Sequence, residues 1–138
     1  VIDVQAIMQN TRNIPSVICR TFPNVEDISI EVSHVEIVDE SSFQHCVNLW
    51  RVNLNVNSIT RIPDNTFRNN PSLQVFLAIV NRIDFIGNAA FTGTALRDIN
   101  LEDNMLPTYN SLAFNSVAST LKELNLVGFK IKLKIHKI

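Results

Sequence analysis

The residues that could carry chemistry in this sequence are two cysteines, three histidines and two pairs of adjacent acids. Cys19 and Cys46 each stand at an offset that is apolar elsewhere in the chain. This placement favours two buried thiols, which pack well in a core. A disulfide between them is the alternative, and it requires their Cα atoms to lie close together.

Metal and catalytic sites find no support in these residues. The three histidines share no ligand spacing with the cysteines, which argues against zinc; they are His34, His45 and His136. The acid pairs, at residues 26–27 and 39–40, are of the kind that solvent usually covers. No phosphate loop, nucleophile elbow or HExxH motif occurs. We therefore expect no enzyme activity, no metal and no cofactor.

The composition is that of one globular domain. The chain has 138 residues, of which 46% are apolar and 18% charged, with a net charge of −1. This charge argues against general nucleic-acid binding. No apolar run reaches the roughly 18 residues of a membrane span. The chain opens without a basic segment followed by an apolar one, so we expect a signal peptide to be either absent or already removed.

An internal repeat organises the whole chain. Successive copies begin at Val25, Leu49, Leu73, Leu96 and Leu121, and one step earlier lies Val1. Apolar residues recur at fixed offsets, two of which are two residues apart, as on one side of a short strand. Two further columns are Asn57, Asn81 and Asn104, and Phe43, Phe67, Phe91 and Phe114. We expect the strands to stack in parallel, the asparagines to satisfy backbone groups at the turns, and the phenylalanines to pack the back.

The repeat LWRVNLNVNSITRIPDNTF, residues 49–67, resembles the leucine-rich repeat family. Its 24-residue length and its Phe are similar to the extracellular class, and CRTFPNV and FQHCVNL resemble insect secreted, receptor and immune repeats. The resemblance implies an α/β solenoid of about six repeats, curved like a horseshoe. A parallel β-sheet would form the concave face, with short turns and one-turn helices on the convex face. We expect one domain, residues 1–138, with residues 129–138 as a terminal capping strand.

The family usually binds ligands on the concave face, so the outward positions there are candidate binding residues. The fourth copy alone is apolar in all three outward columns, at Val75, Leu77 and Ile79. Trp50 lies beside them, and Val32, Val56 and Val80 are expected at the last strand position of three adjacent copies. The polar rim comprises Arg51, Asn53, Asn55, Asp98, Asn100 and Glu102. Contiguous apolar patches often mark interaction sites. The alternatives are ordinary surface residues or a strand covered by another part of the chain.

These observations lead to two hypotheses of function. The first is a secreted, extracellular recognition module that binds a protein partner through its concave face, in innate immunity if the insect resemblance holds. The second is an assembly protein that forms a homodimer through the apolar patch or associates head to tail. Residues 1–50 carry seven acids and two arginines, whereas residues 122–138 carry five lysines and one glutamate. The basic tail is expected either to cap the last repeat, to contact the acidic head of a second molecule, or to attach to an anionic surface.

Overall fold

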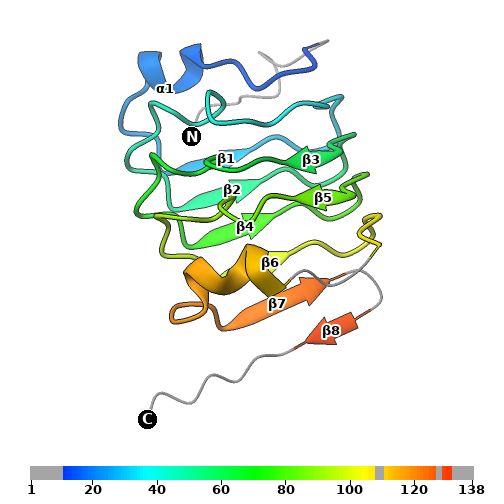
Figure 1. The fold of residues 1–138 in the computed structure, drawn as a ribbon. Coiled ribbons are helices and arrows are strands. Elements are labelled where there is room, and N and C mark those ends of the chain that lie inside the picture. Colours follow the sequence, from blue (N-terminus) through cyan, green and yellow to red (C-terminus); the bar gives the residue numbers. More distant parts are fainter. Residues whose placement is uncertain (1–10, 108–110, 127–128, 132–138) are drawn as a thin grey trace.

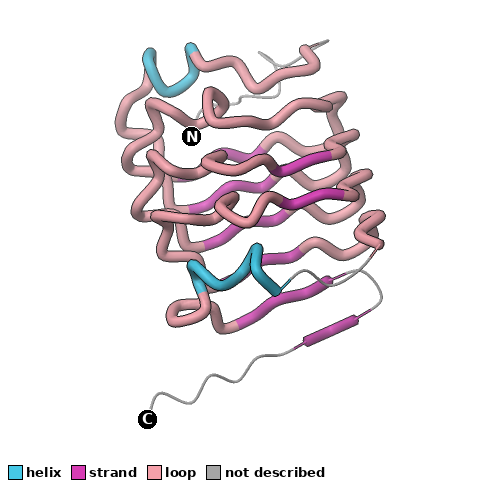
Figure 2. The backbone as a smooth tube through the Cα atoms, in the orientation of Figure 1, coloured by secondary structure: helices cyan, strands magenta, loops and turns pink. Residues whose placement is uncertain are grey.

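The protein is a solenoid of stacked coils (Figure 1). The structure is a computed structural model, and it describes residues 11–107, 111–126 and 129–131. Each coil contributes one short strand to a common sheet and then returns through turns and irregular segments. Figure 2 shows that strands occupy one part of each coil and loops occupy most of the rest. The parallel solenoid predicted from the repeat is confirmed.

The main sheet has six strands in the order β1-β2-β4-β6-β7-β8. The five parallel strands are β1 (Asp27–Ser29), β2 (Arg51–Asn53), β4 (Val75–Leu77), β6 (Asp98–Asn100) and β7 (Glu123–Leu126). Their registers follow the repeat, since Asp27, Arg51, Val75, Asp98 and Glu123 lie opposite one another in turn. The strand expected in the first copy, near residues 3–5, lies outside the described residues.

The last strand of the sheet reverses direction. β8 (Phe129–Ile131) pairs antiparallel with β7, with Leu124 opposite Ile131. An antiparallel strand cannot continue the parallel stack, so the pairing closes the hydrogen-bonding edge of β7. The remainder of the expected capping strand, residues 132–138, lies outside the described residues.

The core forms because the middle residue of each short strand points inward. Five such residues are at most 1% exposed: Ile28, Val52, Phe76, Ile99 and Leu124. Behind them the predicted Phe column is confirmed as a continuous stack. The Phe43 and Phe67 rings are 5.4 Å apart, Phe67 and Phe91 are 6.1 Å apart, and Phe91 and Phe114 are 5.7 Å apart. Each coil therefore buries its apolar side only against its neighbours.

A ladder of buried asparagines joins the coils where the chain leaves each strand. Asn81 Nδ2 donates to the carbonyls of Leu54 and Ala78 at 3.0 and 3.2 Å, and its Oδ1 accepts the Ile59 N–H at 3.1 Å. Asn57 and Asn104 repeat this pattern one coil before and one coil after. The amide supplies both the donors and the acceptor that these buried backbone groups need, as the sequence predicted.

The return segments are short, as expected. A second, two-stranded parallel sheet pairs β3 (Arg61–Ile62) with β5 (Phe85–Ile86). The helical pieces are α1 (Val17–Thr21) and the 3₁₀ helix η2 (Ser111–Val117). Pro, Asn and Ser in these segments favour turns over long helices.

The cysteines contradict the prediction of two buried thiols, because Cys19 in α1 is bonded to Cys46 in a disulfide. Their Cα atoms are 5.1 Å apart, although 27 residues separate them in sequence. The packing of α1 against the next coil brings the two positions together. Asn70, one coil further on, donates to the carbonyls of Phe43 and Cys46 at 2.9 and 3.0 Å, so cross-links continue along this side.

Candidate recognition surface on the sheet

The outward side chains of the main sheet and of the residues that follow its strands form the candidate site, called here the sheet face. Side chains alternate along a strand, so the first and third residues of β2, β4 and β6 point away from the core. The registers place Arg51, Val75 and Asp98 side by side, and likewise Asn53, Leu77 and Asn100. The sequence-predicted columns are thus brought together on one face.

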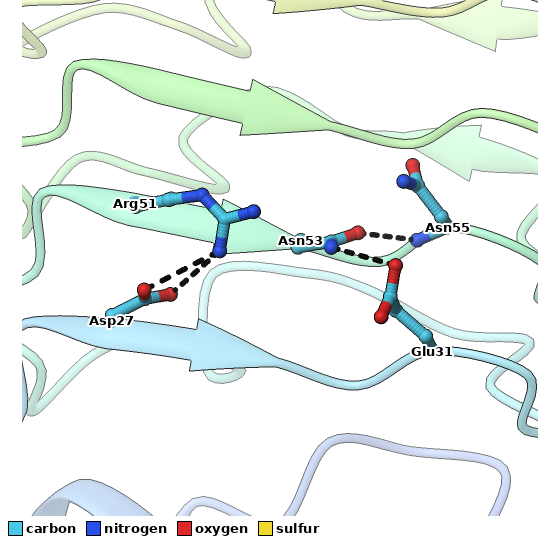
Figure 3. Close-up of polar contacts among 5 residues, drawn as sticks. All are labelled: Asp27, Glu31, Arg51, Asn53 and Asn55. Carbon is cyan, nitrogen blue, oxygen red and sulfur yellow. Dashed lines mark hydrogen bonds and ion pairs between the residues drawn. The ribbon is translucent and has the colours of Figure 1, made fainter. Parts of the chain in front are cut away.

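A polar network covers the part of the sheet face that belongs to β1 and β2 (Figure 3). Arg51 Nη1 lies 3.1 and 3.3 Å from the two carboxylate oxygens of Asp27. Asn53 Nδ2 donates to Glu31 Oε1 at 2.8 Å, and Asn53 Oδ1 accepts the Asn55 N–H at 3.0 Å. Asn53 is only 5% exposed, so it holds Glu31 and Asn55 in place and offers little surface to a partner.

The apolar trio, Val75, Leu77 and Ile79, lies on and just after β4 and is half-buried. In the neighbouring copies the residue equivalent to Leu77 is an asparagine that caps the backbone two residues on. Asn100 Oδ1, for example, accepts the Glu102 N–H at 3.0 Å. Leu77 cannot do this, and Asn55 of the preceding coil accepts the Ile79 N–H instead, at 2.8 Å. The fold therefore accommodates the apolar trio with a hydrogen bond from the neighbouring coil.

A valine ridge (Val32, Val56 and Val80) borders the sheet face where the chain turns after the strands. The prediction that these valines occupy the last strand position is wrong, since β1, β2 and β4 end three residues before them. They have positive φ angles of 49, 58 and 55°, a conformation that side chains branched at Cβ rarely adopt. The equivalent residue of the next copy is Asp103, with φ 54°, which is a residue type that tolerates this conformation better. All three valines are exposed, at 77, 41 and 43%.

The twelve predicted binding residues fall into three groups. The first group is the exposed apolar residues at the two ends of the strands. Trp50, just before β2, is 39% exposed, and Val56 and Val80 lie at the opposite end. The apolar trio is in the middle. The polar members are half-buried apart from the buried Asn53; they are Arg51, Asn55, Asp98, Asn100 and Glu102.

Acidic side chains dominate the charge of the sheet face. Among the described residues of its columns, one is basic, Arg51, and five are acidic: Asp27, Glu31, Asp98, Glu102 and Glu123. No three His, Cys, Asp or Glu side chains in the described part of the chain are arranged to hold a metal ion. The chemistry that the face offers is therefore apolar contact surrounded by hydrogen-bond acceptors and negative charge.

Sequence reasoning missed two features of this surface. Asp27 and Glu31 were not among the predicted binding residues, although the 24-residue spacing puts them in the same outward columns as Arg51 and Asn55. The strain of the valine ridge was also missed, because valine normally indicates strand and not a left-handed turn. The one sign of this strain in the sequence is Asp103, which occupies the same offset and is a residue type that tolerates the left-handed conformation.

In the residues that the structure describes, no helix reaches the length and apolarity that a membrane crossing needs.

Three solved structures share this fold. The APL1 leucine-rich repeat domain matches with a TM-score of 0.74 at 23% identity, over 86% of this chain and 31% of that one. The Toll–Spatzle complex of Drosophila development and innate immunity matches with a TM-score of 0.70 at 24% identity, over 84% of this chain and 17% of that one. The TLR13–ssRNA13 complex matches with a TM-score of 0.65 at 24% identity, over 70% and 14%. This chain thus spans less than a third of each of these structures.

Sequence comparison identifies the repeat itself. No curated protein matches the chain. A family model described as the BspA type leucine-rich repeat region matches residues 7–134 in six copies. With this match across nearly the whole sequence and the parallel solenoid of the structure, the chain belongs to the leucine-rich repeat family.

Proposed function

We propose that the chain is a non-enzymatic recognition module that binds a protein partner through the apolar trio and its acidic surroundings. The observation that carries the proposal is the position of Val75, Leu77 and Ile79 in the middle of the sheet face, where the neighbouring coils place polar or charged residues in the same columns. Soluble proteins rarely gather such residues on one exposed face without a partner.

The size of the patch limits how it can act. Covering the exposed parts of the trio, Trp50, Val56 and Val80 contributes about 4–9 kcal/mol, at roughly half the 1.5–3 kcal/mol of a fully buried large side chain. Association costs an estimated 4–15 kcal/mol, so apolar contact alone gives weak binding. The acidic side chains around the trio must therefore add to the binding free energy. A complementary partner would present apolar residues flanked by lysine or arginine, which argues for a protein and against a nucleic acid.

The disulfide supports an extracellular location. Bonds such as Cys19–Cys46 form and persist in oxidising compartments and are rare in the cytosol. The structural neighbours include a Toll–Spatzle complex in innate immunity and an RNA complex of TLR13. We therefore place the chain, as a proposal, among secreted leucine-rich repeat proteins of the extracellular 24-residue class, with a role in innate recognition of the insect kind.

A peptide selection tests the proposed site. Peptides selected on the wild-type protein from a random display library would be synthesised and titrated by calorimetry. We expect them to combine apolar residues with Lys or Arg, to bind the wild type, and to lose binding to Leu77→Asp and Ile79→Asp. Ile37→Asp is the matched control, since Ile37 is an exposed apolar residue outside the sheet face. Equal binding to the folded Leu77→Asp variant would exclude the apolar trio as the site.

Self-association is the second candidate, because the same exposed valines and trio could contact a second copy. Sedimentation at several concentrations, in low and in high salt, separates the two functions. A dimer that dissociates on Ile79→Asp supports assembly through the patch, and one that dissociates in high salt supports contact between the acidic and basic ends. A monomer under every condition removes the assembly hypothesis.

A further inference from the structure

An open hollow of about 570 Å³ lies at the edge of the sheet where the strands begin, and its lining includes Gln74, directly before Val75 of the apolar trio. Of the described residues, seven from three consecutive coils line it: Gln74, Ala95, Arg97, Ser119, Thr120, Leu121 and Lys122. We call it the rim hollow. Its volume is in the range of pockets that hold small ligands.

The backbone fixes the positions of the two cations beside each other. The Arg97 N–H donates to the Gln74 carbonyl at 2.8 Å, and the Lys122 N–H donates to the Arg97 carbonyl at 2.7 Å. Gln74, Arg97 and Lys122 therefore occupy equivalent positions in successive coils. Arg97 and Lys122 stand directly before β6 and β7, and like charges at such neighbouring positions repel each other and destabilise the fold slightly. An anion between them would remove this repulsion.

The charged side chains of the hollow have no carboxylate partner in the part of the chain that the structure describes. The three ion pairs of the described residues involve Arg12, Arg51 and Arg68, so neither Arg97 nor Lys122 is paired with a carboxylate there. No carboxylate is among the described residues that line the hollow. The Thr120 hydroxyl lies 2.7 Å from the Leu96 carbonyl and 3.2 Å from the Val117 carbonyl, so its single hydrogen is already used within the protein.

We propose that the rim hollow binds an oxyanion, a phosphate or sulfate group, either free or carried on a sugar. Arg97 and Lys122 would supply charge-assisted hydrogen bonds, and the Ser119 hydroxyl and Gln74 amide would supply neutral donors. The half-buried Ala95 adds a small apolar surface beside these groups, whereas Leu121 is buried in the core beneath them. This site is separate from the protein-binding function proposed for the apolar trio.

Titration with inorganic phosphate, inorganic sulfate, a sulfated disaccharide and the same disaccharide without sulfate tests the proposal. Arg97→Gln and Lys122→Gln should each raise the Kd for the anions by about tenfold, since each removes one charge-assisted contact. Arg82→Gln is the matched control, because Arg82 is exposed, has no ion pair among the described residues and lies at the other end of the strands. It should leave the Kd unchanged. Far-ultraviolet circular dichroism would confirm that each variant is folded.

The four probes also identify the source of the anion. Tighter binding of the sulfated disaccharide than of inorganic sulfate, with no binding of the unsulfated form, indicates a sulfated sugar. Equal affinity for the sulfated disaccharide and inorganic sulfate indicates recognition of the oxyanion alone. The proposal is overturned if neither phosphate nor sulfate binds, or if Arg82→Gln weakens binding as much as Lys122→Gln does.

Discussion

The positive φ angle of Val32 leads to a prediction that is unusual for a surface substitution, namely that Val32→Asn stabilises the protein. A left-handed conformation costs an ordinary L-residue about 1–2 kcal/mol, and asparagine tolerates it better. Val32 has φ 49° and is 77% exposed, so little of its side chain is buried. Losing that contact costs about 0.3–0.7 kcal/mol, at 1.5–3 kcal/mol for a fully buried side chain. Because asparagine still bears part of the cost of the left-handed conformation, the net gain is about 0.5–1 kcal/mol.

The same reasoning predicts different results along the valine ridge. Val56 and Val80 are 41 and 43% exposed, so replacing them loses about 1–1.7 kcal/mol of apolar contact and cancels the relief of strain. Their Asn variants should therefore be nearly neutral. Asp103→Val is the reverse substitution at the same offset, with φ 54°, and should destabilise the protein by about 1 kcal/mol.

Urea denaturation and thermal melting measure these differences. A gain of 0.5–1 kcal/mol should raise the Tm of a chain of this length by about 2–4 °C. Val47→Asn is the matched control: Val47 is 53% exposed and is not among the residues of positive φ, so the substitution should bring no gain. If Val32→Asn is no more stable than Val47→Asn, and Asp103→Val is neutral, the valine ridge is not strained.

Three further predictions concern the core and its cross-links. Asn81→Ala should lower the free energy of unfolding by about 1–3 kcal/mol, measured in urea, because it leaves the buried Ile59 N–H without an acceptor, while the Leu54 and Ala78 carbonyls keep the bonds from Asn57 and Asn104. Removing the disulfide with Cys19→Ala and Cys46→Ala should lower it by about 3–4 kcal/mol for a loop of 27 residues. Hydrogen exchange should then increase mainly near α1, because each coil contacts only its neighbours. Gly87→Ala should lower the Tm and cost about 1–3 kcal/mol, because the new Cβ would lie 2.6 Å from the Asp64 backbone nitrogen.

Each of these three has an outcome that contradicts it. Asn48→Ala is the control for the asparagine ladder, since the exposed Asn48 makes one bond of 3.5 Å, and an equal loss in both variants would show that the ladder is not special. Uniform loss of exchange protection across all coils on removing the disulfide would contradict nearest-neighbour coupling. An unchanged melting temperature for Gly87→Ala would mean that the turn at Asp64 moves aside without cost.

The sequence predicts the register of the sheet because a 24-residue spacing permits one alignment of the apolar columns. Shifting the second or fourth strand of the stack by one residue, for example, would expose Val52 or Ile99 and turn a charged or polar neighbour toward the core. The Asn and Phe columns follow for the same reason, since each has one chemical role that every coil repeats. Repetition is what makes this part of the fold readable from a single sequence.

Features outside the repeated apolar, Asn and Phe columns could not be predicted in this way. The two cysteines stand at offsets that are otherwise apolar, which favoured buried thiols, and sequence spacing gives no Cα separation for a disulfide. The distance of 5.1 Å depends on how α1 packs against the next coil. The ends of the strands were also misjudged, because the valines suggested extended backbone whereas the turn imposes a positive φ.

The sheet face combines several features that each reduce stability, and their coincidence is the main argument for a binding role there. Leu77 replaces an asparagine that would cap the backbone, so Asn55 of the neighbouring coil must accept the Ile79 N–H. Val56 and Val80 adopt a costly conformation beside the trio and remain exposed. None of these choices improves folding, and an Asn, as at Asn100, would satisfy the turn directly. Strained and locally inconsistent residues persist where function requires them, so their clustering around the trio favours a partner at that position over chance surface variation.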